Sequence, residues 1–368
     1  MAPAPFLAAV LLLAAPAAAQ SWLEPTGSFD LDWSGYEGEG DLRLAEDDFP
    51  DDFDLRRARI GVKGTLHPRL SYRSTFRIEP DGLETWDLFL DATSPEETFR
   101  LRVGRFKEGV GYERMTRPVD VGFLERGPAT TALTPNRNQG VQLRTLLPAD
   151  RGSWTLGLFR EIDPVSGSRR DGAFADDLDL STRVAVNNGA FGEEQLLLQL
   201  GVSASLRRPD DGLVAFDHRM LRGARRVVDT GELAADRVQL GSLEFLARRG
   251  RWSLESEYLE ARVQQSGGGD LRFPGGMVKL RLVPAGEQLH YQSSVARFRA
   301  DRQPWHLAAR VAWVDLTDGG VQGGRLDMNS IGATWWMHPR LALLAEVGQA
   351  EVDGETAWYA GVRLHLDF

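Results

Sequence analysis

The sequence contains no cysteine and only 6 histidines among its 368 residues. Without thiols, the protein cannot depend on disulfides for stability and cannot use thiol catalysis or thiolate metal ligands. The histidines are scattered, and His67 and His338 each stand in an HPR triplet that predicts a turn. No nucleophile motif of a Ser/His/carboxylate enzyme stands near His290 or His365. We therefore expect no metal, no cofactor and no enzymatic activity.

After the first nineteen residues, the chain lacks any apolar run near the roughly 18 residues that a membrane-spanning helix requires. Those nineteen residues, MAPAPFLAAVLLLAAPAAA, form a short apolar run that ends in small residues. No Lys or Arg precedes the run, but Ala17-Ala18-Ala19 fits an A-x-A cleavage site. We expect residues 1–19 to be a signal peptide and residues 20–368 to form the exported domain; a buried or membrane helix is the alternative.

A positive net charge is also absent, since the formal charge is −10. The acidic residues concentrate in segments such as 46–52, 171–179 and 207–212, which we expect to be loops. With 26% charged and 42% hydrophobic residues, the composition resembles that of a soluble protein. It equally fits a transmembrane β-barrel, because such a barrel alternates lipid-facing apolar and lumen-facing polar residues.

What the sequence does contain is alternation of apolar and polar residues with a period of two. In residues 69–79, RLSYRSTFRIE, aromatic and aliphatic residues alternate with Arg, Ser and Thr. Residues 98–104 and 358–368 follow the same pattern. Strict alternation predicts half-buried strands. The predicted strands are 27–36, 53–64, 69–79, 84–92, 97–107, 137–147, 153–161, 179–187, 194–206, 237–248, 252–263, 275–283, 305–316, 326–337, 341–350 and 357–368.

The connections between these segments alternate in length. The short ones include 67–69, 148–152, 248–251 and 338–340. The longer, polar ones are 37–52, 108–136, 162–178, 207–236, 264–274 and 317–325. Short turns at one end and long loops at the other are typical of an outer-membrane barrel. We therefore predict an all-β fold, a sixteen-stranded antiparallel transmembrane β-barrel with both termini on the periplasmic side; a secreted β-rich module is the alternative.

The segment 53–64, FDLRRARIGVKG, is basic although the chain is acidic. Alternation places Arg57, Arg59 and Lys63 on one face, which we interpret as the lumen. It places Arg56 on the other face, unless a β-bulge or the strand end changes its direction. Arg73 and Arg102 continue the basic surface on neighbouring segments. Guanidinium groups suit a path for phosphate-like anions because they stay charged and donate forked hydrogen bonds.

Several stretches resemble the phosphate-selective porin O/P family. They are LRRARIGVKGTL, LRVGRFKEGVGYERMT, GFLERG, NRNQGVQL and NSIGATWWMHPRLALLAEV, and the resemblance runs from about residue 53 to the C-terminus. It implies a sixteen-stranded trimeric barrel for passive anion uptake with a preference for phosphate. It also implies that a third loop, here 108–136, folds inward as a constriction; from the residues alone, this segment could equally be a solvated surface loop.

The resemblance also implies pore residues. The paired arginines of the family's second strand match Arg56 and Arg57, the constriction-loop lysine falls on Arg114, and a pore aspartate falls on Asp87. Asp87 could orient arginines or weaken anion binding; an ordinary strand-end carboxylate is the alternative. Two eyelet aromatics are replaced by Arg59 and Lys107, and two lysines by Arg297 and Arg302. The predicted pore-lining residues are Arg56, Arg57, Arg59, Lys63, Arg73, Asp87, Arg102, Lys107, Arg114, Arg297 and Arg302.

These departures favour an anion pathway but leave its preferred anion open between phosphate, polyphosphate and other small anions. We expect Arg114 to lie inside the barrel near Arg57 or Arg59. The expected location is the bacterial outer membrane, with its lipid and lipopolysaccharide as partners, no nucleic acid, and assembly as a homotrimer. The alternatives are a general anion-preferring diffusion porin and a secreted polyanion-binding module.

Overall fold

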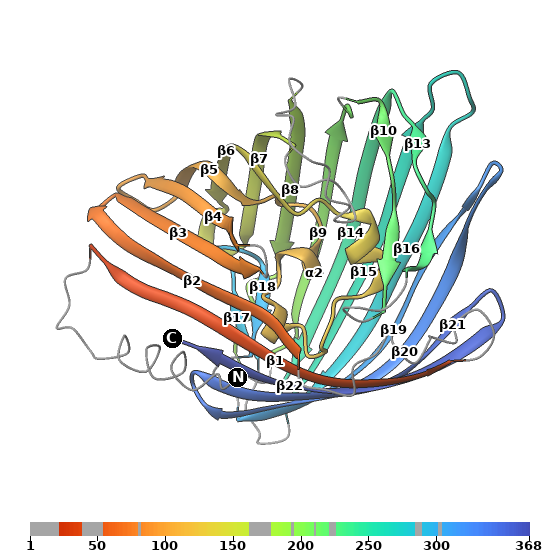
Figure 1. The fold of residues 1–368 in the computed structure, drawn as a ribbon. Helices are drawn as coiled ribbons and strands as arrows, with labels where there is room; N and C mark the ends of the chain where they lie inside the picture. Colours follow the sequence, from red (N-terminus) through yellow and green to blue (C-terminus); the bar gives the residue numbers. More distant parts are fainter. Residues whose placement is uncertain are drawn as a thin grey trace.

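The computed structural model describes residues 22–38, 54–79, 82–161, 178–192, 195–209, 211–220, 226–283, 289–300 and 304–368. Within them, sixteen antiparallel strands close into one barrel (Figure 1). The strands are β1 (Glu24–Gly38), β2 (Asp54–His67), β3 (Leu70–Glu79), β4 (Gly82–Thr93), β5 (Phe99–Lys107), β6 (Arg137–Leu146), β7 (Gly152–Arg160), β8 (Asp179–Asn187), β9 (Leu197–Arg207), β14 (Arg237–Arg249), β15 (Trp252–Gln264), β16 (Leu271–Leu282), β19 (Trp305–Asp318), β20 (Val321–His338), β21 (Leu341–Val352) and β22 (Glu355–Asp367).

The first and last strands close the barrel, because β1 pairs antiparallel with β22, with Phe29 opposite Leu366 and Trp33 opposite Val362. The predicted fold class is therefore confirmed, and each predicted strand overlaps one observed strand. The closed barrel excludes the secreted sandwich-like module. The predicted signal peptide, residues 1–19, lies outside the described residues.

A β-bulge changes the direction of one predicted pore residue. Asp30 pairs with Arg57 but Leu31 pairs with Leu55, so Arg56 is an extra residue in β2. Strict alternation would point Arg56 outward, whereas its Nε lies 2.7 Å from Oε1 of Glu125, within the lumen segment described below. The bulge therefore turns two consecutive arginines inward. A second register shift, between β3 and β4, makes Trp86 the extra residue before Asp87.

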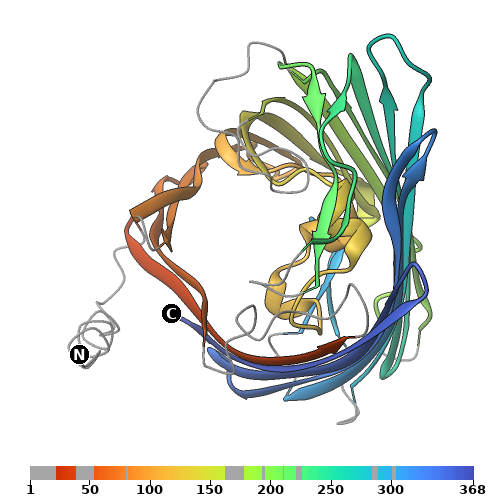
Figure 2. The ribbon, with the colours of Figure 1, turned by 45° about the vertical axis from the view of Figure 1, so that its right-hand side comes forward.

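The alternation between apolar and polar faces is clear in β2–β9 but fails at one end of β14–β22. There the inward-facing residues, such as Leu240, Phe273 and Val314, belong to a buried apolar core. The core is completed by the connection between β9 and β14, which forms the short strands β10 (Leu213–Val214), β11 (Asp217–Arg219), β12 (Arg226–Asp229) and β13 (Leu233–Ala234). Figure 2 shows this connection in green across the barrel mouth. At this end, the wall is thus apolar on its inner face as well as its outer face.

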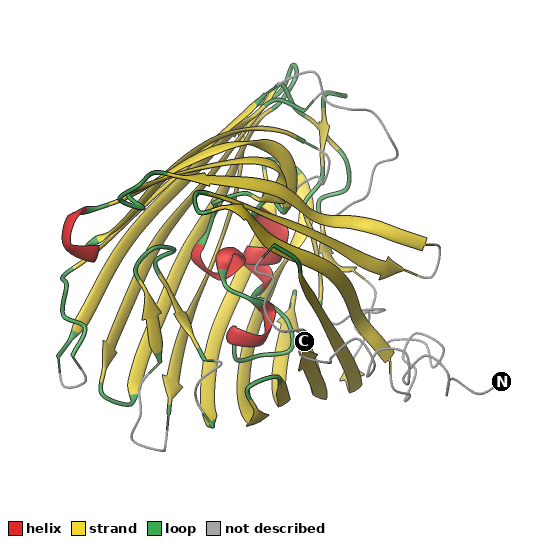
Figure 3. Ribbon diagram, turned by 90° about the vertical axis from the view of Figure 1, so that its left-hand side faces the viewer, coloured by secondary structure: helices red, strands yellow, loops and turns green. Residues whose placement is uncertain are grey.

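The connection between β5 and β6, residues 108–136, lies inside the barrel (Figures 2 and 3). It contains α2 (Tyr112–Met115), a 3₁₀ turn (Pro118–Asp120) and α3 (Pro128–Leu133). We call it the lumen segment. It lies against β14–β22, with α3 packed on β15, β16 and β19. No helix among the described residues is long and apolar enough to cross a membrane.

Some connection lengths depart from the predicted alternation. β19 extends to Asp318 and β20 begins at Val321, so the predicted long connection at 317–325 is a tight turn. At the opposite end, which holds the turns and both barrel termini, the connection from β16 to β19 is long and carries the short strands β17 (His290–Gln292) and β18 (Arg297–Arg299). It packs against the lumen segment from the turn end of the barrel, and Phe298 and Tyr112 belong to one apolar cluster there.

Candidate functional site

A cavity of about 880 Å³ lies beside the lumen segment, between it and the inner faces of β1–β6. Among the described residues that line it, ten are Lys or Arg and five are Asp or Glu. The cations are Arg59, Lys63, Arg73, Arg100, Arg102, Lys107, Arg117, Arg137, Arg297 and Arg299. The cavity is therefore basic although the whole chain carries a formal charge of −10.

Three arginines surround the ring of Trp86, and two of them, Arg59 and Arg137, line the cavity. The guanidinium carbons of Arg59, Arg77 and Arg137 lie 4.5, 4.7 and 4.0 Å from the centroid of its ring. Arg77 is also paired with Glu84 at 2.5 Å, and Arg137 with Asp87 at 2.9 Å. Arg59 makes no ion pair in the described part of the chain, so its charge is balanced only by the ring and by more distant carboxylates.

Two arginines flank Phe89 farther toward the turn end. Arg102 binds both carboxylate oxygens of Asp91 at 2.7 Å, and its guanidinium lies 3.8 Å from the centroid of the Phe89 ring. On the other side, Arg73 is the cross-strand partner of Phe89. Arg73 lines the cavity and has no ion pair among the described residues. Arg59 and Arg73 are thus two cavity cations without an ion pair among the described residues.

The other predicted lining residues occupy varied environments. Lys107 donates a hydrogen bond of 2.6 Å to the carbonyl oxygen of Arg114 and has no carboxylate partner in the described structure. Lys63 pairs with Glu24 at 3.2 Å. Arg297, on β18, donates to the carbonyl oxygen of Met115 and so connects the turn-end hairpin to the lumen segment. The remaining predicted residue, Arg302, lies outside the described residues.

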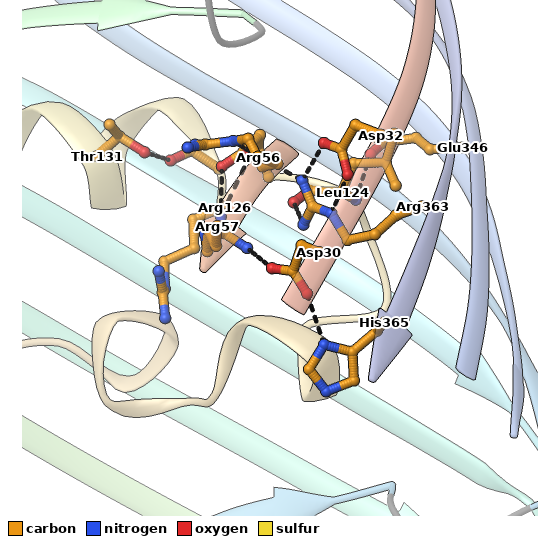
Figure 4. Close-up of polar contacts among 12 residues, drawn as sticks. Asp30, Asp32, Arg56, Arg57, Leu124, Arg126, Thr131, Glu346, Arg363 and His365 are labelled. Atoms are coloured by element: carbon orange, nitrogen blue, oxygen red, sulfur yellow. Dashed lines mark hydrogen bonds and ion pairs between the residues drawn. The ribbon is translucent and has the colours of Figure 1, made fainter. Parts of the chain in front are cut away.

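Arg56 and Arg57 hold the lumen segment rather than standing open to the cavity. Glu125 of that segment lies 2.7 Å from Arg56, 3.2 Å from Arg57 and 3.1 Å from Arg363. Burial alone would raise the pKa of the Glu125 carboxyl, but these guanidinium groups hold that pKa well below its usual range. Arg57 also binds Asp30 at 2.9 Å, and Oδ1 of Asp30 lies 2.6 Å from Nδ1 of His365 (Figure 4).

Arg114 serves the lumen segment internally. It donates to Oγ1 of Thr134 at 2.6 Å and to the carbonyl oxygen of Thr130 at 2.8 Å, at the end of α3. Its side chain is buried, and it does not line the cavity. The residue of the segment that contacts Arg57 is Glu125, so the expected contact of the loop with Arg57 is made by a different side chain.

The wall behind the lumen segment supplies hydrogen-bond partners for its irregular backbone. Two wall carboxylates accept hydrogen bonds from backbone N–H groups of the segment. Glu257 accepts from the N–H of Tyr112 at 2.6 Å, and Glu346 accepts from the N–H of Leu124 at 2.7 Å. Cations donate to its carbonyls: Lys279 to Val121 at 3.1 Å, and Arg310 to Glu125 at 3.0 Å. Because a buried backbone polar group needs a partner, these wall charges fix the position of the segment.

Sequence reasoning did not identify Trp86, Phe89 or Arg137 as cavity residues. The bulge before Asp87 breaks the alternation that would have shown Trp86 facing inward. Arg137 immediately follows the lumen segment, where alternation gives no direction for its side chain. Phe89 has the parity of Asp87 and Asp91, and this spacing is the signal that could have placed its ring in the lumen.

Solved structures with the same fold are outer-membrane porins. The anion-selective porin from Comamonas acidovorans aligns with a TM-score of 0.55 and 13% identity, covering 94% of this chain and 99% of that one. OprB of Pseudomonas putida aligns with a TM-score of 0.59 and 11% identity, covering 95% and 94%. At these identities the likeness shows the fold alone.

Sequence comparison gives closer relationships. An uncharacterized protein of Caulobacter vibrioides is 26% identical over 345 residues, which cover 86% of this chain and 68% of that protein. The profile of the family described as phosphate-selective porin O and P matches residues 26–362. Family and fold together indicate a channel rather than an enzyme. The chain belongs to the phosphate-selective porin O and P family, and its location is the bacterial outer membrane.

Proposed function

We propose that the protein mediates passive uptake of small anions, phosphate and polyphosphate among them, through the basic cavity beside the lumen segment. The observation that carries the proposal is the excess of ten cations over five carboxylates around this cavity. A channel must replace part of an ion's hydration shell and then release the ion. Arg59, Arg73 and Lys107 can do the first, while Asp87 and Asp91 keep their neighbouring arginines from binding too strongly.

The lumen segment acts as the constriction in this proposal. It fills the side of the lumen next to β14–β22 and leaves the anion path along β2–β6. Arg56, Arg57 and Arg114 then contribute indirectly, because they hold the segment in place. Arg59, Lys63, Arg73, Asp87, Arg102, Lys107 and Arg297 line the path itself. The turn end faces the periplasm, and three copies form the working assembly, as in the trimer form of the OmpT structure from Vibrio cholerae.

Lumen charge should determine selectivity because it is local and poorly screened. The acidic segments lie mainly in connections between strands, and charges farther away than a Debye length, about 8 Å at physiological salt, are largely screened. In a narrow, low-dielectric passage each nearby cation acts more strongly than it would in water. An acidic protein can therefore have an anion-selective pore.

The test is the reversal potential of the purified protein in planar bilayers under a KCl gradient. Wild type should prefer chloride, and the double variant Arg59→Glu with Arg73→Glu should lose or reverse that preference, by at least about tenfold in permeability ratio if each reversal changes the local ion energy by about 1 kcal/mol. The matched control is Arg262→Glu with Arg272→Glu. It changes net charge equally on exposed outer side chains and should leave the ratio unchanged.

A cation-selective wild type would overturn the proposed function, and an unchanged preference in the Arg59/Arg73 variant would remove these two residues from it. Phosphate added to the same bilayers distinguishes a phosphate-selective pore from a general anion-preferring porin. If phosphate inhibits chloride current at concentrations where sulfate does not, the pore is phosphate-selective. Equal effects of the two ions would favour a general anion-preferring diffusion porin.

A further inference from the structure

We infer that the cavity contains a subsite for anions with an aromatic body, namely small aromatic carboxylates, centred on Phe89. This inference rests on the proposed anion channel and adds a class of permeant to it. The observation behind it is the side chain of Phe89, which is half-buried and lines the cavity between two arginines. The neighbouring aromatic residue, Phe106, is by contrast only 1% exposed.

The geometry around Phe89 combines a ring with a cation that makes no direct ion pair among the described residues. Its cross-strand partner on β3 is Arg73, which has no ion pair within the described residues. Arg102 stacks on the ring at 3.8 Å and is held in place by Asp91. Arg102 is thus fixed and locally neutralised, whereas Arg73 is available to a ligand carboxylate. Guanidinium groups bind carboxylates through two parallel hydrogen bonds, which makes Arg73 the natural head-group partner.

The lumen segment contributes apolar side chains to the cavity beside Arg117, whose guanidinium pairs with Asp120 at 2.6 Å. Met115, Pro118 and Val119 of the lumen segment line the same cavity, and Met115 and Pro118 are only half-buried. Methionine sulfur and proline ring carbons pack well against aromatic rings. An aromatic carboxylate can therefore place its ring between Phe89 and the lumen segment while its carboxylate binds Arg73.

This arrangement is difficult to explain by a path for inorganic anions alone. A strongly hydrated ion gains no hydrogen bond from Phe89, Met115 or Pro118 and loses water beside them. Packing alone does not explain the exposure either. Phe106 meets Phe159 and Phe89 at centroid distances of 5.3 and 6.1 Å and is completely enclosed, whereas Phe89 keeps part of its surface in the cavity. A ligand with both a ring and a negative charge can pack its ring on Phe89 and bind Arg73 with its charged group.

The experiment compares benzoate with acetate in planar bilayers containing the wild-type protein. Permeability ratios relative to chloride are taken from reversal potentials in bi-ionic solutions. Although benzoate is larger, its ratio should exceed that of acetate at least twofold. Phe89→Leu, which keeps an apolar side chain but removes the ring, should lower the benzoate ratio at least threefold and leave the acetate and phosphate ratios unchanged. Phe99→Leu is the matched control, because Phe99 is 48% exposed on the lipid-facing side of β5.

The outcomes distinguish this inference from the function on which it rests. A chloride-selective wild type in which acetate permeates better than benzoate would overturn the aromatic subsite and leave the anion channel intact. An unchanged benzoate ratio in Phe89→Leu, or an equal loss in Phe99→Leu, would also overturn it. A cation-selective wild type would instead overturn the proposed function.

Discussion

The two halves of the inner barrel wall carry similar charged residues but use them differently. On β2–β5, Arg59, Arg73 and Lys107 face the cavity and have no carboxylate partner in the described structure. On β14–β22, residues such as Lys279 and Glu346 are buried and bonded to the lumen segment. The comparison teaches that inward direction alone does not make a charged residue part of an ion path. What decides is whether its hydrogen-bonding capacity is already used by the protein.

The physical reason for the difference lies in the lumen segment. A chain of 29 residues (108–136) without long helices or strands cannot satisfy its own backbone inside a barrel. The facing wall therefore provides both donors and acceptors. On the opposite wall, only part of the basic surface contacts the segment, through Arg56, Arg57 and Lys107. Arg59 and Arg73 line the cavity instead. One predicted basic lumen thus divides into a structural half and a path-lining half.

The largest expected effect comes from breaking the structural half at Glu346. This carboxylate accepts hydrogen bonds from the Leu124 N–H at 2.7 Å, Arg310 at 3.2 Å and the Tyr359 hydroxyl at 3.0 Å. Glu346→Ala leaves Arg310 buried with an incomplete set of partners, and removal of one member of a buried pair costs about 3–5 kcal/mol. We expect a clearly lower thermal midpoint of barrel unfolding in detergent and a larger, noisier single-channel conductance.

Glu351→Ala provides the control for this prediction. Glu351 lies on the same strand, β21, but is exposed on the outer face, so its removal should change stability by no more than about 0.5 kcal/mol. Equal midpoints for the two variants would show that Glu346 does not hold the lumen segment.

The barrel itself could be predicted because its determinants are local. Alternation with a period of two identified all sixteen strands, since each has one face toward lipid and one toward the lumen. For the inward direction of Arg56, the sequence left two explanations open, a β-bulge or the strand end. The structure has the bulge. The short strands of the 208–236 connection could not be found in this way. Strands of two to four residues are too short for a periodic pattern and form only because the inner wall provides an apolar surface for them.

The candidate site was less predictable for a different reason. Alternation placed Arg57 and Arg59 correctly on one face, but it carries no information about partners across the lumen. Arg57 meets Glu125, 68 residues away in sequence, whereas Arg59 meets Trp86. The path of the lumen segment decides which arginines Glu125 neutralises. Arg114 illustrates the same limit, because it donates to a carbonyl and a hydroxyl group at the end of a helix that the sequence did not predict.

A second, smaller effect should appear in the β9–β14 connection, whose docking on the inner wall depends on an uncharged histidine. His218, on β11, is 2% exposed, and neither ring nitrogen has a hydrogen-bond partner in the described structure. Burial, with the nearby charge of Arg310, lowers the pKa of His218 to about 4. When the connection is undocked, the imidazole is exposed to water and has an ordinary pKa of about 6.5. Above a pH of about 6.5, His218 is uncharged in both states, so docking of the β9–β14 connection does not depend on its titration. Below that pH, the free energy of docking weakens by up to about 1.4 kcal/mol per pH unit. The loss ends near a pH of about 4, where the docked His218 also takes up a proton.

Amide hydrogen exchange of residues 226–236 at pH 7.5 and pH 5, corrected for the intrinsic pH dependence, measures this effect. We expect exchange at pH 5 to be roughly thirtyfold faster than the corrected value at pH 7.5, and His218→Leu to abolish the difference. The lumen segment supplies an internal comparison. Because its anchor Glu125 has a pKa well below the usual range, that anchor should keep its charge over the same interval. Protection that fell equally in both segments would rule out His218 as the cause.

The smallest effect is expected at Trp86, which tests how the open half of the wall keeps its cations close together. Three guanidinium groups share its ring, which is buried. A cation–π contact contributes about 0.5–1 kcal/mol at an exposed site and about 2 kcal/mol when desolvated. Trp86→Leu removes these contacts without changing the number of charges in the cavity. Anion selectivity should therefore persist, while single-channel conductance changes by less than about twofold as Arg59 gains freedom. Trp86→Phe keeps an aromatic face and should fall between wild type and the Leu variant. A loss of selectivity in Trp86→Leu as large as in the Arg59/Arg73 double variant would mean that the position of these arginines, and not their charge alone, governs which ions pass.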